Sequence, residues 1–286
     1  LGDVVGATGT NSGVVESEMT IAGVRIAGSL LGGSSSGSGR ISSDLSMGTI
    51  AIGKNLIGGS ASGSADLTLS GAIVSGGRIH QITIGQSFIS GTNNTTGIFV
   101  DNGLISARQE IGSILVGKNI QGQSNSLAVI RAGGFVEPTA LSSVSIGTLI
   151  VRGNVDWGLV LAGWDTNGNP TNADAQIGTI FVAGHWTASS VAAGAVSTNG
   201  WFGDADDTKI SGIGVKDEPH ITSKINSIVI GGQVTGTAAA GDHFGFVAQQ
   251  VGFVKVGGSI IPTIFGPSND NTLVGTSNDV RIREIS

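Results

Sequence analysis

Short apolar segments with one fixed pattern recur along the chain, and nearly everything else connects one copy to the next. The clearest copy is Ile111–Gly122, I-G-S-I-L-V-G-K-N-I-Q-G. Repeats spaced 26 to 48 residues apart are typical of solenoids, propellers and arrays. With the first residue of the unit as position zero, the copies begin at Ile21, Met47, Ile79, Ile111, Ile146, Ile177, Ile225 and Val251.

The pattern within each copy predicts two short strands joined at a corner. Positions three and five are aliphatic in every copy, as in Ile114 and Val116, and side chains two apart on a strand share a face. Position nine is also apolar throughout, from Leu30 to Ile260. Glycine and small polar residues separate the two strands, so the chain turns at positions six to eight. We therefore expect positions three, five and nine to form the core.

Position eight holds a residue that can form hydrogen bonds in every copy. If successive copies stack about 4.8 Å apart, these side chains form a column at one corner, and asparagine ladders add hydrogen bonds. The alternative is a loop that merely favours polar residues. The column would contain Ser29, Asn55, Ser87, Asn119, Asn154, His185, Gln233 and Ser259.

A further strand is expected after the second one in most copies. Two or three short strands per coil, separated by Gly- and Ser-rich corners, predict an all-β fold: a single-stranded parallel β-helix, or β-solenoid, of about eight or nine coils. The expected third strands are Leu67–Leu69, Ile98–Val100, Val129–Arg131, Leu159–Leu161, Phe244–Val247 and Val280–Ile282.

The repeated I-G-x-I-x-V-G-x-N motif resembles the right-handed β-helical passenger regions of bacterial autotransporters and large secreted adhesins. The resemblance covers residues 21–286. It implies a bacterial protein that is secreted or displayed on the cell surface, as a fibre, stalk or adhesin segment, and it carries over no catalytic residue. Calcium-binding solenoids with G-G-x-G-x-D repeats are excluded, because the Gly-Gly pairs here lack the following Asp.

Composition narrows the classes of partner and of site. With 14 Lys and Arg against 20 Asp and Glu, the net charge is −6, and the basic residues are scattered, which disfavours nucleic acid. Cysteine is absent, so disulfides and thiolate metal sites are excluded. No segment approaches the about 18 uncharged apolar residues of a membrane span. We expect one elongated domain over residues 1–286, with an atypical first coil at 1–20.

Two insertions interrupt the regular coils, at 163–176 and 187–224. Insertions within a solenoid repeat often form a binding face, and all four tryptophans lie near these segments. Trp164, Trp201 and Phe202 are therefore candidate contact residues. The alternative is that the tryptophans fill a wider cross-section beneath long loops.

Position four points outward, and in four successive middle coils it is apolar: Leu115, Ile150, Phe181 and Val229. Such a row is too apolar for bare solvent, so either the long loops or another chain should cover it. The C-terminal strand Val280–Ile285 has no recognisable cap. The expected partners are thus a second copy of the chain, packed axially or laterally, or a cell-surface polysaccharide.

Few residues are candidates for chemistry. Asp165, Asn167, Asn169 and Asp174 resemble part of a calcium loop, although a polar turn explains the same residues. Asp204, Asp206 and Asp207 form a second acidic cluster. Paired carboxylates of the kind that hydrolyse glycosides are rare and tyrosine is absent, so no catalytic residue is assigned. The leading hypothesis is a non-enzymatic adhesive or structural protein; the alternative is a polysaccharide lyase or glycoside hydrolase.

Overall fold

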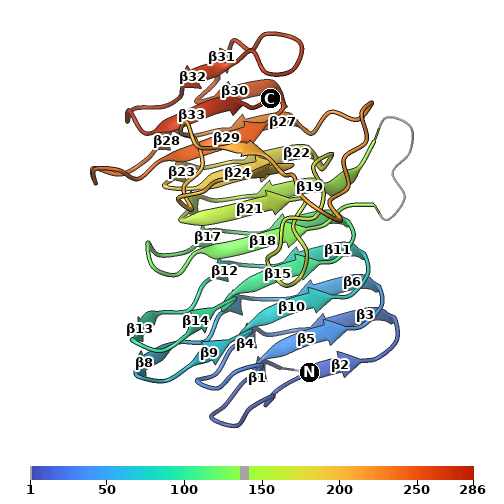
Figure 1. The fold of residues 1–286 in the computed structure, drawn as a ribbon. Coiled ribbons are helices and arrows are strands. Elements are labelled where there is room, and N and C mark those ends of the chain that lie inside the picture. Colours follow the sequence, from blue (N-terminus) through green and yellow to red (C-terminus); the bar gives the residue numbers. More distant parts are fainter. Residues whose placement is uncertain (1, 136–141) are drawn as a thin grey trace.

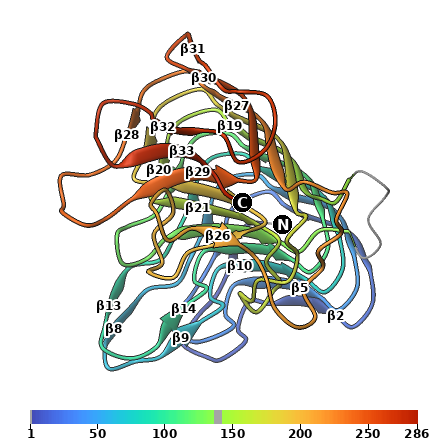
Figure 2. The same ribbon diagram turned by 45° about the horizontal axis from the view of Figure 1, so that its top comes forward.

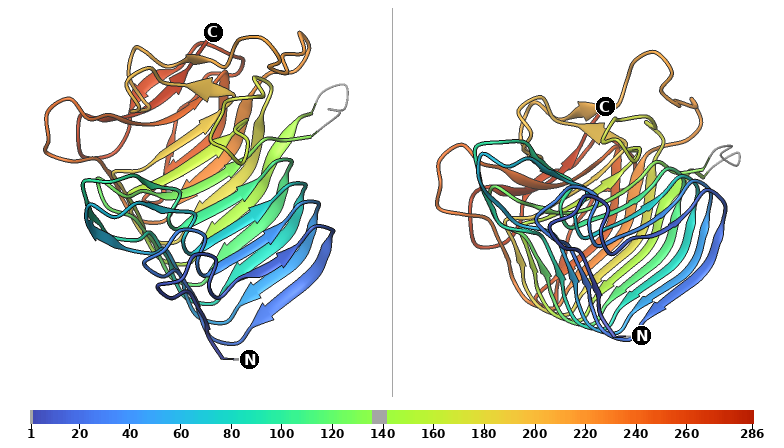
Figure 3. Two further views of the ribbon diagram at one scale, coloured as in Figure 1. Left: turned by 60° about the horizontal axis from the view of Figure 1, so that its bottom comes forward. Right: turned by 90° about the horizontal axis from the view of Figure 1, so that it is seen from below.

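The computed structural model describes residues 2–135 and 142–286, so Leu1 of the expected first coil lies outside the described part. Every regular element in that part is a β-strand, and the strands stack into three long, mainly parallel sheets (Figure 1). The chain winds from one sheet to the next and then moves up by one strand, as the view from below makes plain (Figure 3). An all-β fold with long parallel sheets is therefore confirmed.

The first sheet contains the longest strand of each circuit. Its parallel strands are β3 (Ile21–Ile26), β6 (Met47–Ile52), β11 (Ile79–Ile84), β16 (Ile111–Val116), β19 (Val144–Val151), β22 (Gln176–Val182), β27 (Lys224–Ile230) and β30 (Gln250–Val256).

The second sheet is built from two-residue strands that begin at position nine. They are β1 (Val4–Val5), β4 (Leu30–Leu31), β7 (Leu56–Ile57), β12 (Phe88–Ile89), β17 (Ile120–Gln121), β20 (Val155–Asp156), β23 (Trp186–Thr187) and β28 (Val234–Thr235).

The third sheet closes each circuit. Its parallel strands are β2 (Val15–Ser17), β5 (Arg40–Ser43), β10 (Ala72–Ser75), β15 (Leu104–Ala107), β18 (Ala128–Ala132), β21 (Gly158–Ala162), β24 (Ser190–Ala193), β29 (Phe244–Ala248) and β33 (Val280–Glu284). Three short pairs lie at the side: β8 (Ala61–Gly63) with β13 (Asn93–Thr95), β9 (Leu67–Thr68) with β14 (Phe99–Val100), and β25 (Ala195–Val196) with β26 (Thr208–Lys209).

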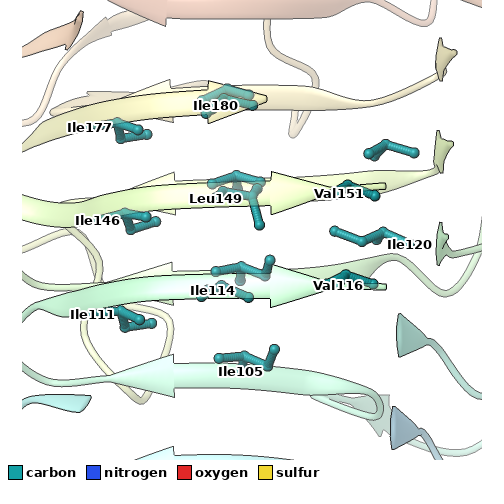
Figure 4. Packing of buried hydrophobic residues seen from close by; sticks show 14 of the residues in the cluster. Ile105, Ile111, Ile114, Val116, Ile120, Ile146, Leu149, Val151, Ile177 and Ile180 are labelled. Atoms are coloured by element: carbon teal, nitrogen blue, oxygen red, sulfur yellow. The ribbon is translucent and has the colours of Figure 1, made fainter. Parts of the chain in front are cut away.

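Equivalent positions of successive copies are register partners. Ile114 pairs with Ile82 below and Leu149 above, so each apolar column continues from coil to coil (Figure 4). Ile114 is 1% exposed, and almost all residues at positions three, five and nine share its burial. Position zero, exemplified by Ile111, also faces inward. The expected core is confirmed. It also includes the column of residues at position zero, which was not expected from the sequence.

The polar residues at position eight form a continuous ladder. The backbone N–H of Asn154 donates to Asn119 Oδ1 at 2.9 Å, and the N–H of His185 donates to Asn154 Oδ1 at 2.9 Å. Below them, Asp3 begins the ladder by accepting from the Ser29 N–H. The remaining steps join Ser29 to Asn55, Asn55 to Ser87, Ser87 to Asn119, and His185 to Gln233. Each side chain from Asp3 to His185 thus satisfies a backbone donor that the turn leaves without a sheet partner.

Four of the six expected third strands lie in the third sheet, as β18, β21, β29 and β33, and the other two lie outside it. Leu67–Leu69 and Ile98–Val100 fall at the lateral pair β9 and β14, while the third sheet uses Ala72–Ser75 and Leu104–Ala107 instead. Each of these two strands follows a glycine with positive φ, at Gly71 and Gly103.

At the C-terminal end, antiparallel strands cover the first and third sheets, contrary to the expectation that Val280–Ile285 has no cap, while β28 is the outermost strand of the second sheet. Gly257 and Gly258 have positive φ, which reverses the chain into β31 (Ser259–Ile261), antiparallel to β30. Ser259 is therefore not part of the ladder and Ile260 is not part of the core, although the sequence predicted both. Ile260 is 64% exposed. β32 (Asn271–Leu273) pairs in the same antiparallel way with β33.

At the opposite end, β1, β2 and β3 are the outermost strands of their sheets, so within the described residues their outer edges have no strand partner. None of the described residues belongs to a helix long and apolar enough to cross a membrane.

Candidate binding cleft and acidic loop

The long insertion is shorter than the expected 187–224, because Thr187 ends β23, Ser190–Ala193 form β24 and Lys224 begins β27. Residues 194–223 pack on the outer face of the third sheet, where β26 lies in front of that sheet in Figure 2. Phe202 is 5% exposed and lies against Leu161, Ala192 and Val247. Phe202 therefore packs the insertion onto the sheet, and its role as a contact residue stays a prediction.

The apolar row at position four lies on a different face, the outside of the first sheet. Phe181 is 39% exposed, and Leu115, Ile150 and Val229 are half-buried beside it. Residues 194–223 pack on the third sheet instead, and Phe181 remains open to solvent. At Phe181, the long loops therefore do not cover the apolar row of position four.

The four tryptophans have different surroundings. Trp186 is fully buried in the core. Trp164 is half-buried and donates from Nε1 to the Ala195 carbonyl at 3.2 Å. Trp157 and Trp201 both pack edge-on against Phe244, with ring centroids 5.7 Å and 5.5 Å from it.

Trp157 and Trp201 line an open cleft of about 450 Å³ on the side of the stack. Trp157 has a φ of 52°, a backbone conformation that bulky residues rarely adopt and that often marks functional positions. The cleft combines aromatic rings and small apolar groups with a few polar ones, as small-ligand sites do. Its other lining residues are Ser124, Thr237, Ala239, Ala240, Gly241 and Asp242.

Sequence reasoning identified Trp201 but missed the rest of this cleft. Trp157 follows β20, and Thr237–Asp242 lies between β28 and β29. Only the stacking of coils brings these segments together, and nothing in the repeated pattern marks Thr237–Asp242. The shape of the Thr237–Asp242 segment depends on Asp279, whose Oδ2 accepts a hydrogen bond from the Thr237 N–H at 2.7 Å.

The expected calcium residues separate into a turn and a buried group. Asp165 Oδ1 accepts from the backbone N–H groups of Asn167 and Asn169, both at 2.8 Å, so it holds its own turn together. Asp174 is buried and accepts from the Glu218 N–H, and burial raises the pKa of its carboxyl. The turn interpretation explains Asp165, and calcium binding there stays a prediction.

Asp165 also faces basic neighbours. It lines a second cleft, of about 380 Å³, together with Arg108 and Lys216. The Lys216 ammonium donates to the Phe135 carbonyl, and burial together with Arg108 lowers its pKa. Two basic groups in the same cleft oppose a divalent cation.

Asp204, Asp206 and Asp207 lie in the loop that joins β25 to β26, and one oxygen of each lies within 4.8 Å of the others. Asp206 Oδ2 accepts from Thr198 Oγ1 and from the Asn199 N–H at 2.9 Å, and the Thr198 bond is the main cause of its lowered pKa. Burial raises the pKa of Asp207 to about 7.

The neighbouring residues Asp217 and Glu218 have separate partners. Asp217 accepts from Lys209 Nζ at 2.6 Å, while the Glu218 backbone N–H donates to Asp174 Oδ2 at 2.8 Å. His243 lies 4.0 Å from Asp204, at the edge of the acidic loop.

Comparison of this chain with protein-family models, with curated proteins and with solved structures found no match.

Proposed function

We propose that this chain is a single-stranded parallel β-helix that serves, without catalysis, as an adhesive segment of an extracellular fibre or stalk. The coil-by-coil register and the corner ladder support the β-helix, because the same positions meet in every coil. Such a stack suits a stalk, since stability extends along the axis by nearest-neighbour contacts.

The observation that carries the adhesive role is the cleft between Trp157 and Trp201. Indole rings offer large, rigid apolar faces, against which the C–H faces of a sugar ring can stack. Ser124 and Thr237 supply hydroxyls beside them. A cell-surface polysaccharide is the partner that fits this combination.

Charge favours a neutral polysaccharide over a uronic-acid polymer. Asp242 lies in the cleft, and the whole chain carries a net charge of −6. An anionic glycan would meet like charge on approach.

The test is binding of soluble polysaccharides, measured by calorimetry and affinity electrophoresis. We expect Trp201→Ala and Trp157→Ala each to weaken binding about tenfold or more, or about 1.4 kcal/mol. Trp164→Ala, at a half-buried tryptophan outside the cleft, is the matched control and should bind like the wild type. Unchanged binding in both cleft variants would contradict the proposal.

The enzyme alternative has one specific observation in its favour. The pKa of Asp206 is lowered and that of Asp207 is raised, a combination that acid–base pairs use. However, the Asp207 side chain is 0% exposed, so it has no access to a sugar. Release of new reducing or unsaturated ends from any polysaccharide, abolished by Asp206→Asn, would overturn the non-enzymatic proposal.

A further inference from the structure

The tip of the β25–β26 hairpin concentrates negative charge that its neighbours only partly balance. Three carboxylates meet there. The Arg283 Nε lies 3.7 Å from Asp207 Oδ2, and its positive charge opposes one of the three negative charges. A net negative charge remains, which a divalent cation would neutralise.

Hydrogen bonds reach five of the six carboxylate oxygens and hold the three side chains in place. Asp204 accepts at Oδ2 from Asn199 Nδ2 at 2.7 Å and at Oδ1 from the Asp206 N–H at 3.1 Å. Asp206 accepts at Oδ2 from Thr198 and the Asn199 N–H, and at Oδ1 from Ser197 Oγ. Outer donors of this kind orient the carboxylates that ligate a metal.

An oxygen without a partner points independently to a ligand. Asp207 Oδ2 accepts from the Gly203 N–H at 2.7 Å, but Asp207 Oδ1 is buried and has no hydrogen-bond partner. The side chain is 0% exposed, and a buried carboxylate oxygen left unpaired costs free energy. A cation held between the three aspartates would satisfy it.

We propose that Asp204, Asp206 and Asp207 form a calcium site. All the protein ligands are carboxylate oxygens, which calcium prefers, and calcium accepts irregular geometry completed by water. Magnesium demands stricter octahedral geometry, which a loop tip supplies poorly. The ion would also brace the loop that carries Trp201, the residue that lines the cleft on one side.

The experiment is calorimetric titration of the chelator-treated 286-residue chain with calcium chloride, paired with thermal melting. We expect saturable binding to the wild type and a higher melting temperature with calcium. Asp207→Asn and Asp204→Asn should each lose the saturable heat and the shift. Asp204 is only partly buried, so its variant stays informative if Asp207→Asn fails to fold.

Asp165→Asn is the matched control, because Asp165 also lies in an Asp- and Asn-rich turn beside a tryptophan. It should keep full calcium binding. The proposal is overturned if the wild type shows neither heat nor shift, if both acidic-loop variants keep them, if Asp165→Asn alone loses them, or if magnesium binds as tightly. None of these readouts depends on a polysaccharide, so failure of this site and failure of the adhesive role are separable.

Discussion

Replacing Ile114 by asparagine is expected to lower the free energy of unfolding by about 3–5 kcal/mol, because it removes apolar burial and leaves an amide unpaired. Ile114 is 1% exposed and its column runs through every coil, so the structure has no room to turn the amide toward water. Chemical denaturation followed by circular dichroism measures the loss.

Thr83→Asn is the matched control for this experiment. Thr83 lies on the neighbouring strand and points outward, paired with Leu115, so the same asparagine there should cost under about 1 kcal/mol. Equal losses for the two variants would show that the inner and outer faces of the first sheet have been exchanged.

Asp101→Asn should cost about 3 kcal/mol, since it leaves the buried Arg131 guanidinium without a counter-charge. Arg131 Nη1 and Nη2 donate to the two Asp101 oxygens at 2.8 Å and 2.9 Å, and the Arg131 side chain is 6% exposed. Asparagine keeps the size of the side chain and tolerates the φ of 60° at this position, so the change isolates the charge.

A double-mutant cycle with Arg131→Met separates the ion pair from its surroundings. The guanidinium also donates to the Thr166 carbonyl and to Ser106 Oγ, so Arg131→Met alone carries a cost of its own. We expect the double variant to lose at least about 2 kcal/mol less than the sum of the single losses. Additive losses would mean that the two residues do not stabilise each other.

The sequence predicted those parts of the fold that repeat in register. Ile114 and Val116 show strand alternation that recurs in each copy, and the core follows directly. Asn119 and Asn154 stand at one place in the unit, so the ladder follows from stacking alone. Both features depend on a local pattern that is present in the sequence of each coil.

Features that depend on contacts between coils were not predictable in this way. The third-sheet strands Ala72–Ser75 and Leu104–Ala107 are apolar themselves, with the sequences A-I-V-S and L-I-S-A. These coils therefore contain two apolar segments in succession, and the local pattern does not distinguish the one that enters the sheet. In the sequence, the available signal for the start of each strand was the glycine just before it, Gly71 or Gly103. In the structure both glycines have positive φ. Pairing of Asp101 with Arg131, 30 residues away, leaves no trace in the repeat.

The placement of every site described above rests on the coil-to-coil register, and cysteine pairing tests that register directly. The chain has no cysteine, so two introduced thiols report only on each other. Thr83 and Leu115 are register partners, and neighbouring strands lie about 4.8 Å apart, within the Cα range of a disulfide. Thr83 and Ile150 are separated by one more strand, roughly 10 Å, beyond that range.

Oxidation of the Thr83→Cys/Leu115→Cys variant should therefore consume both thiols within a monomer, measured by thiol titration and mass spectrometry. The Thr83→Cys/Ile150→Cys variant should keep its thiols under the same conditions. Free thiols in the first variant together with an internal disulfide in the second would contradict the proposed stack of coils.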